Sequence, residues 1–263
     1  MFVNEKLFFP FGLFYKMTSE NELEIINRTR FNTIATEYLN KNLMDMLQIT
    51  QQGKIKIIFN MHEYTLESKI LTDSNNEENY KTISNRIKEF KDHPALLSWF
   101  INDEIPSIYN KFLRNITLLI HELDPNHPSY TVTNYATDFH LLMNTSDILG
   151  VDKYPIGPLL PIRYVYDLNE QANYHMLESK PMIPVCQIYD YGTILLRKYR
   201  NPIFTKSQPT LQEMLSMSWQ ALVGGGKGLM YYGFYELTLL DDVTPFEDVW
   251  KVVFWIIRKN LEI

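Results

Sequence analysis

The sequence predicts an α/β fold, a single (β/α)8 barrel in which eight parallel strands alternate with helices. The chain has 263 residues, close to the about 250 residues that such a barrel takes. Short runs rich in β-branched and aromatic residues alternate with longer amphipathic stretches along the whole chain. No break in composition divides the sequence, so residues 1–263 are predicted to form one domain.

The eight predicted strands are short apolar runs bounded by turn residues or polar clusters. They span residues 7–15, 31–37, 54–63, 96–103, 129–135, 148–154, 181–189 and 228–235. Helical stretches separate these runs, and that alternation is typical of parallel pairing. A doubly wound open sheet has the same alternation, but the count of eight and the chain length favour the closed barrel.

The predicted helices carry ordinary start and stop signals. Ser19 and Glu22 form a capping-box pattern at the start of the first helix. Thr210 is expected to cap the helix that runs to about Val223, and the glycine run 224–226 to end it. After a loop at 72–79, a helix is expected to end near residue 91. The other predicted helices cover residues 19–30, about 39–47, 107–123, 138–143, 162–178 and 246–260.

Composition excludes several classes of partner. The hydrophobic share of 45% and the net charge of −6 are typical of a folded globular chain rather than a disordered one. A pI near 5.6 argues against a nucleic-acid partner. No run reaches the roughly 18 apolar residues of a membrane helix, so no membrane partner is expected.

The N-terminal residues and the single cysteine do not indicate the cellular compartment of the protein. The first fifteen residues lack a basic region and a small-residue cleavage site, which predicts a first strand rather than a signal peptide. The compartment stays open, because the chain could equally be a domain of a longer secreted protein. Cys186 lies in an apolar run and is expected to be a buried small hydrophobe. No cofactor and no metal are expected.

The most informative stretch runs from His93 to Pro106. An apolar run ends in Asn102, Asp103 and Glu104, and a helix follows with Pro106 near its start. This order places Glu104 at the carboxyl end of the fourth strand, where barrel enzymes carry their catalytic groups. The alternative is that Glu104 only interacts with the dipole of the following helix.

The other predicted strand ends are rich in carboxylates, amides and aromatic rings. They include Tyr15, Glu37, His62, Glu63, Asn134, Tyr135, Asp152, Tyr154, Gln187, Asp190, Tyr232 and Glu236. Such a set suits glycoside hydrolysis, in which one carboxyl protonates the leaving oxygen and a second acts as nucleophile or base. A lyase or isomerase using Glu104 as base is a weaker alternative, because neither a phosphate cradle nor a metal signature is present.

The roles at these positions are assigned as follows. Glu104 is expected to be the proton donor. The substrate contacts are expected to be Tyr15, His62, Asp103, Asn134, Tyr154, Gln187 and Tyr232. Aromatic residues that could form platforms for sugar rings also include Trp99, Tyr135 and Tyr189, but for any single one of these aromatic residues packing is the favoured interpretation.

Three segments resemble glycoside hydrolases of the TIM-barrel superfamily. The segment 93–106 is similar to their fourth-strand region, and 147–155 to their sixth strand. Pro209, Thr210, Glu213 and residues 221–232 resemble their final helix–strand unit. The resemblance covers most of the chain from Phe8 onward. It implies a TIM barrel, a carbohydrate substrate and the acid/base position for Glu104.

The chain departs from this family at the seventh strand. Retaining members of the large clan carry a nucleophilic Glu there, and this sequence has Gln187, whose neutral amide cannot form a stable glycosyl ester. Three alternatives remain. The second carboxylate is Glu236 or Asp152, ranked ahead of Asp190; a substrate N-acetyl group is the nucleophile, oriented by Asp103 or Asp152; or the barrel binds carbohydrate without cleaving it.

Overall fold

The computed structural model describes residues 1–3, 5–15, 26, 31–36, 55–61, 77–158, 160–177, 179–190 and 208–233. Several predicted features lie outside the described residues. They are Glu37, His62, Glu63, Glu236 and most of the helices predicted at 19–30, 39–47 and 246–260. The backbone of Tyr15 is described, but its side chain is not.

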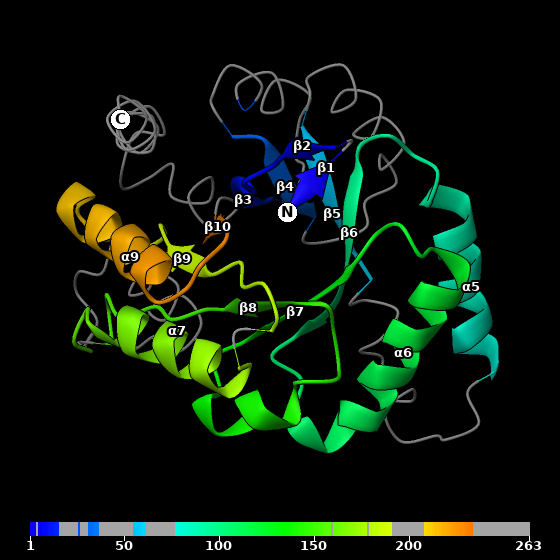
Figure 1. Ribbon diagram of the computed structural model, residues 1–263. Helices are drawn as coiled ribbons and strands as arrows, with labels where there is room; N and C mark the ends of the chain where they lie inside the picture. The colour runs from blue at the N-terminus through cyan, green and yellow to red at the C-terminus, as the bar shows by residue number, and fades with distance from the viewer. Residues whose placement is uncertain are drawn as a thin grey trace, which may run out of the picture.

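Eight parallel strands form the barrel (Figure 1). They are β3 (Phe11–Tyr15), β4 (Thr33–Thr36), β5 (Lys56–Asn60), β6 (Leu96–Asp103), β7 (Ser129–Thr133), β8 (Ile148–Val151), β9 (Val185–Gln187) and β10 (Leu229–Tyr232). The strands pair in chain order from β3 to β8, and β10 lies between β3 and β9. Isolated parallel bridges, Leu149 to Met182 and Asp152 to Val185, join the β8 and β9 segments. The predicted (β/α)8 TIM barrel is therefore confirmed.

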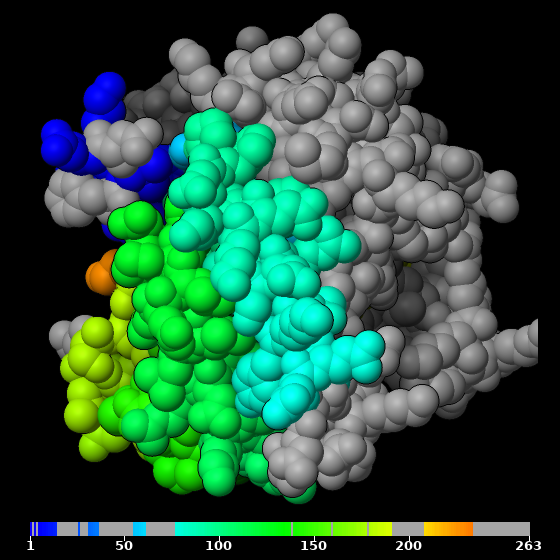
Figure 2. Space-filling model, turned by 90° about the vertical axis from the view of Figure 1, so that its right-hand side faces the viewer, coloured from blue at the N-terminus to red at the C-terminus, as the bar shows by residue number. Residues whose placement is uncertain are grey.

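Helices cover the outside of the strands. Helices α5 (Glu77–Phe90) and α6 (Asn110–Leu123) lie side by side on the face of the molecule that Figure 2 shows. Helices α7 (Tyr164–His175) and α9 (Leu211–Val223) pack against each other farther around the barrel (Figure 1). A small antiparallel hairpin of β1 (Phe2–Val3) and β2 (Lys6–Leu7) precedes β3. None of the helices in the described part of the chain is long and apolar enough to cross a membrane.

The core has two main apolar clusters, one inside the barrel and one between the strands and the surrounding helices. Successive side chains of a strand face opposite sides, so β3 to β6, β9 and β10 contribute to both clusters, while the outer side of β8 packs in a third cluster with α7. The inner cluster includes Phe14, Ala35, Ile58, Phe100 and Met230. The larger outer cluster lies between the strands and the helices, and it contains residues such as Ile57, Ile116 and Met217.

Trp99 belongs to the outer cluster. Its side chain is fully buried, packs edge-on against Phe59 and donates a hydrogen bond of 2.9 Å from Nε1 to Asp124 Oδ2. Trp99 therefore packs in the core, the interpretation favoured for each single aromatic residue, and it offers no platform for a sugar ring. Register shifts on both sides of β6 decide which of its residues face the helices, and apolar composition alone does not reveal them.

Local signals predict most element ends well. Thr210 caps α9 in a full capping box, in which Glu213 N donates to Thr210 Oγ1 and Thr210 N donates to Glu213 Oε2. Helix α5 is described from Glu77, inside the predicted loop at 72–79, and the acidic Glu77 and Glu78 suit the N-terminal part of a helix. The helix predicted at 107–123 starts as a 3₁₀ turn, Ser107–Tyr109, and the one predicted at 138–143 is the 3₁₀ helix Ala136–Leu141. Cys186 is buried as expected, and burial raises the pKa of its thiol to about 12.

Candidate active site

The backbone turns sharply at Glu104, directly after β6. Its φ of 54° lies in the left-handed region, which a residue with a side chain adopts only at a cost of about 1–2 kcal/mol. Two hydrogen bonds hold the turn: Ile105 N donates to Asn102 Oδ1 at 2.9 Å, and Glu104 N donates to Val132 O at 3.0 Å. Strain of this kind gathers at functional sites, where the surrounding structure maintains it.

Asp103 and Glu104 both reach the mouth of the barrel, the end where the carboxyl ends of the strands meet. In a regular strand these consecutive side chains would face opposite sides. Asp103 pairs in register with Val132, whose side chain is inside the barrel. Both carboxyl groups also raise the pKa of Asp152, which follows β8. The turn at Glu104 thus brings two consecutive carboxyls close to a third.

The Glu104 side chain contacts groups from two neighbouring strand ends. The Asn134 amide, which follows β7, donates a short hydrogen bond from Nδ2 to Glu104 Oε1. The carboxyl of Asp152 is within hydrogen-bonding reach of Glu104 and of Tyr154. Asp152 is only 4% exposed, and its Oδ1 has no hydrogen-bond donor among the described residues. One proton between Asp152 and Glu104 would satisfy both carboxyls.

The three carboxyls cannot all be charged at neutral pH. Burial, and then the charge of Glu104, raise the pKa of Asp103 to about 7. Asp103 retains exposed surface, but the protein around the mouth displaces enough water to disfavour its charge. Burial, followed by Glu104 and Asp103, raises the pKa of Asp152 well above its usual value. The site therefore holds at least one proton that a substrate could receive.

Asp103 makes the stability of the fold depend on pH. Its pKa is about 7 in the folded chain against an ordinary value of 3.8, so between these values the folded state binds more protons than the unfolded state. Stability must then fall as the pH rises through this window. We expect Asp103→Asn to be more stable than the wild type at pH 8 and close to it at pH 4, measured by urea unfolding. Asp92→Asn, an exposed acid at the other end of β6, is the control. A gain for Asp103→Asn of equal size at both pH values would contradict this account.

Three tyrosines pack together on the same side of the mouth. Tyr154 stacks on Tyr232, with ring centroids 5.6 Å apart and planes at 18°. Tyr189 meets both rings edge-on, each at a centroid distance of 5.4 Å. We call Tyr154, Tyr189 and Tyr232 the tyrosine trio. Burial and the neighbouring Asp152 raise the pKa of the Tyr154 hydroxyl well above its usual value. Tyr154 and Tyr232 are partly exposed, whereas Tyr189 is buried at 4% exposure, so Tyr189 packs in the core and offers no surface to a sugar ring.

Gln187 lies at the end of β9, and its amide is bonded to the backbone. Nε2 donates to Ile156 O at 2.8 Å and to Tyr189 O at 3.2 Å, and Oε1 accepts from Ile156 N at 3.0 Å. The side chain has no exposed surface. In this conformation it offers nothing for a substrate to contact. Its partner Ile156 is 31 residues away in sequence, so no local pattern could have revealed these bonds.

The remaining predicted site residues are placed as follows. Asp190 is half-exposed after β9, and it is not among the groups that shift the pKa of Asp152. Tyr135 is 44% exposed beside Asn134. His62, Glu236 and the side chain of Tyr15 lie outside the described residues. The structure thus gathers Asp103, Glu104, Asn134, Asp152 and Tyr154 in one cluster.

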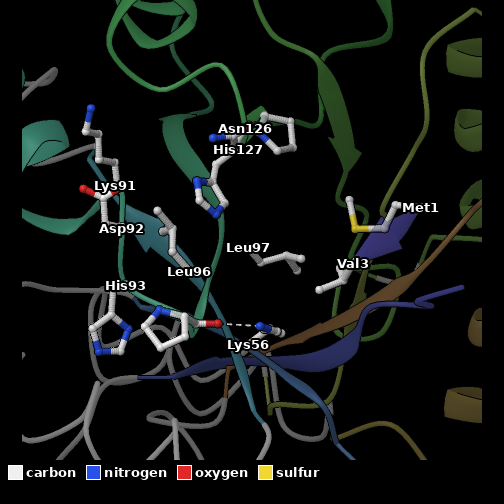
Figure 3. A pocket seen from close by; sticks show the side chains of 12 residues that line it. Met1, Val3, Lys56, Lys91, Asp92, His93, Leu96, Leu97, Asn126 and His127 are labelled. Atoms are coloured by element: carbon white, nitrogen blue, oxygen red, sulfur yellow. Dashed lines mark hydrogen bonds between the residues drawn. The ribbon is translucent and has the colours of Figure 1, made fainter. Parts of the chain in front are cut away.

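A cavity of about 530 Å³ lies at the opposite end of the barrel, where the strands begin. It is lined by residues such as Val3, Lys56, His93, Leu97 and Pro128 (Figure 3). The Lys56 ammonium donates to Pro94 O, and the Lys91 ammonium lies well apart from it (Figure 3). The cavity is separated from the carboxyl cluster by the length of the barrel, so it takes no part in the chemistry of the mouth.

No family model and no curated protein matches the chain. Several solved structures share its fold. A β-glucuronidase from an uncultured Clostridium sp. is 17% identical, with a TM-score of 0.62 over 89% of this chain and 45% of that one. A GH2 β-galacturonidase from Eisenbergiella tayi is 20% identical, with a TM-score of 0.58 over 82% of this chain and 39% of that one. A family 5 mannosidase from Rhizomucor miehei is 11% identical, with a TM-score of 0.59 over 81% of this chain and 75% of that one.

These similarities agree with the (β/α)8 barrel as the fold of this chain, a fold that it shares with these glycoside hydrolase structures. At such low identities they show the fold alone, because one barrel architecture supports many chemistries. The chain spans less than half the length of the β-glucuronidase and the β-galacturonidase.

Proposed function

We propose that the chain is a glycoside hydrolase that acts on an oligo- or polysaccharide, with Glu104 as the general acid/base. One observation carries this proposal: the strained turn holds Glu104 at the barrel mouth, with its carboxyl against Asp152 and Asn134. The fold shared with β-glucuronidase, β-galacturonidase and mannosidase structures supports it.

The cluster has the proton chemistry that the reaction requires. Cleavage of a glycosidic bond needs a proton on the leaving oxygen, supplied by a carboxyl that is protonated at the working pH. Because burial and the charges of Glu104 and Asp103 raise the pKa of Asp152, the cluster keeps a proton at neutral pH, and Glu104 is the group that delivers it to the substrate. After it has left, the Asn134 amide hydrogen-bonded to Glu104 stabilises the resulting carboxylate.

Asp152 suits the role of proton partner better than that of nucleophile. Retaining glycosidases separate their carboxyls by about 5 Å, and inverting ones by roughly 6.5–9.5 Å. Glu104 and Asp152 are within hydrogen-bonding reach instead. The candidates for the second carboxylate are then Glu236 and Asp190, or a substrate N-acetyl group oriented by Asp103. Tyr154 and Tyr232 supply the platform for a sugar ring, and Tyr189 packs edge-on against both of them.

The acid role of Glu104 is tested by comparing two substrates whose leaving groups differ in their need for a proton. We expect Glu104→Gln to lower kcat/KM for an unactivated saccharide by about 10²–10⁴-fold, the usual value of general acid catalysis. A 2,4-dinitrophenyl glycoside needs no protonation of its leaving group, so Glu104→Gln should lose much less kcat/KM on this substrate. Steady-state rates of both proteins on both substrates measure this, with Asp92→Asn as control. Equal losses on the two substrates would rule out the acid role.

A carbohydrate-binding barrel without hydrolysis is the second candidate. It is favoured by Gln187, which occupies the position of the family's nucleophile and is bonded to the backbone. Under this alternative the wild type binds saccharides on a glycan array and releases no product from any of them.

A further inference from the structure

The amide of Gln187 joins two loops that carry two members of the tyrosine trio. It contacts both backbone groups of Ile156, two residues beyond Tyr154, and also the carbonyl of Tyr189. We propose that Gln187 is a positioning residue that fixes the trio as one wall of the barrel mouth and thereby sets the affinity for carbohydrate. The inference rests on the proposed function and adds a role that the family resemblance does not give to this position.

The bonding pattern requires an amide of this length. The amide uses two N–H donors and one oxygen acceptor. Among side chains, only those of Asn and Gln offer two donors and an acceptor on one planar group. A carboxylate could accept from Ile156 N, but it would face the carbonyl oxygens of Ile156 and Tyr189 without a proton to donate. Gln187 is also fully buried, so water cannot replace a bond that is lost.

The held loop also contacts the carboxyl cluster. The Tyr154 hydroxyl lies close to the Asp152 carboxyl, and the Tyr154 ring stacks on Tyr232. Pro155, next to Tyr154, is buried, and Ile156 packs against the outer core. A displacement of Ile156 would therefore move Tyr154 relative to both Tyr232 and Asp152. Loosening this loop should first weaken the aromatic platform, while Glu104 keeps its own bonds to Asn134 and β7.

This role accounts for a glutamine at the seventh-strand position. The amide of Gln187 holds the loops of the mouth in place, and the chemistry depends on carboxyl groups of other residues. Gln187→Glu is consequently expected to loosen the wall rather than to create a nucleophile.

The test compares Gln187→Met with Asn169→Leu. Asn169 is a matched control, because it is a buried amide that donates to a backbone carbonyl, Val165 O, at 2.8 Å within α7. Hydrogen–deuterium exchange of the segment 153–158 is measured first and needs no ligand. We expect its exchange to rise about tenfold or more in Gln187→Met and to stay at the wild-type rate in Asn169→Leu.

Kinetics provide the second readout. On a saccharide that the wild type hydrolyses, KM should rise about tenfold in Gln187→Met while kcat changes by less than about threefold, the signature of lost uniform binding. If Gln187→Met does not fold, Gln187→Asn is used, since it keeps the amide but is too short to reach Ile156.

Two outcomes would overturn the inference. One is wild-type exchange of segment 153–158 in a folded Gln187 variant. The other is a higher kcat in Gln187→Glu, which would mark the position as a nucleophile site. If the wild type hydrolyses no saccharide, the proposed function fails, and the exchange measurement still decides the role of Gln187.

Discussion

Replacement of Glu104 by glycine is expected to stabilise the fold and to lower kcat/KM strongly at the same time. The left-handed φ of 54° costs a residue with a Cβ about 1–2 kcal/mol, and glycine adopts it freely. Glycine loses roughly 0.5–1 kcal/mol more backbone entropy than alanine on folding, so relief of strain should exceed that loss. Without the carboxyl, kcat/KM should fall about 10²–10⁴-fold.

Alanine at the same position separates strain from chemistry. Glu104→Ala removes the carboxyl just as glycine does, but it keeps the Cβ and therefore the strain. Urea unfolding should find Glu104→Gly more stable than Glu104→Ala, with kcat/KM lowered equally in both variants. Equal stability of the two variants would show that the turn at Glu104 is not strained, and wild-type turnover in either would remove Glu104 from the mechanism.

Gly12→Ala is expected to cause the largest loss of stability. Gly12 lies in β3 and pairs with Thr33 of β4. A Cβ on Gly12 would lie 1.9 Å from the carbonyl oxygen of Thr33 and 2.6 Å from its carbonyl carbon. These atoms are backbone of a neighbouring barrel strand, so no side chain can move to make room. Overpacking usually costs about 1–3 kcal/mol, and a forced separation of two barrel strands should reach or exceed the top of that range.

Thermal and urea unfolding of Gly12→Ala measure this loss, and Gly228→Ala is the graded control. The Cβ added at Gly228 would meet Pro10 O at 2.9 Å, so a shift of a few tenths of an ångström relieves most of the clash. We expect a clearly smaller loss there. Similar losses at both positions would indicate that the close approach of β3 and β4 is not what Gly12 provides.

The sequence predicted the barrel and many element ends because the signals for them are local. Strand β6 has its predicted bounds, since a buried apolar run ends abruptly in Asp103 and Glu104. Helix α9 begins at a capping box and ends at a glycine, both readable from a few adjacent residues. The face on which Trp99 lies was not predictable, because register shifts against β5 and β7 decide it.

The candidate site also has features that the sequence predicted and features that it could not predict. Closure of a parallel barrel brings all strand ends to one mouth, which is why residues as distant as Asp103, Asn134 and Asp152 could be grouped beforehand. The left-handed turn at Glu104 and the backbone bonds of Gln187 could not be predicted. Both depend on groups from other strands, Val132 for the turn and Ile156 for the amide.

The most direct test of the central claim is a hydrolysis screen of wild type beside Glu104→Gln. Both proteins are incubated with a panel of oligosaccharides and aryl glycosides, and released product is measured together with the thermal stability of each protein. We expect the wild type to cleave at least one substrate, and Glu104→Gln to cleave it at least about 10²-fold more slowly at an unchanged or higher melting temperature. Cleavage at equal rates by the two proteins, or saccharide binding by the wild type without any cleavage across the panel, would contradict the account.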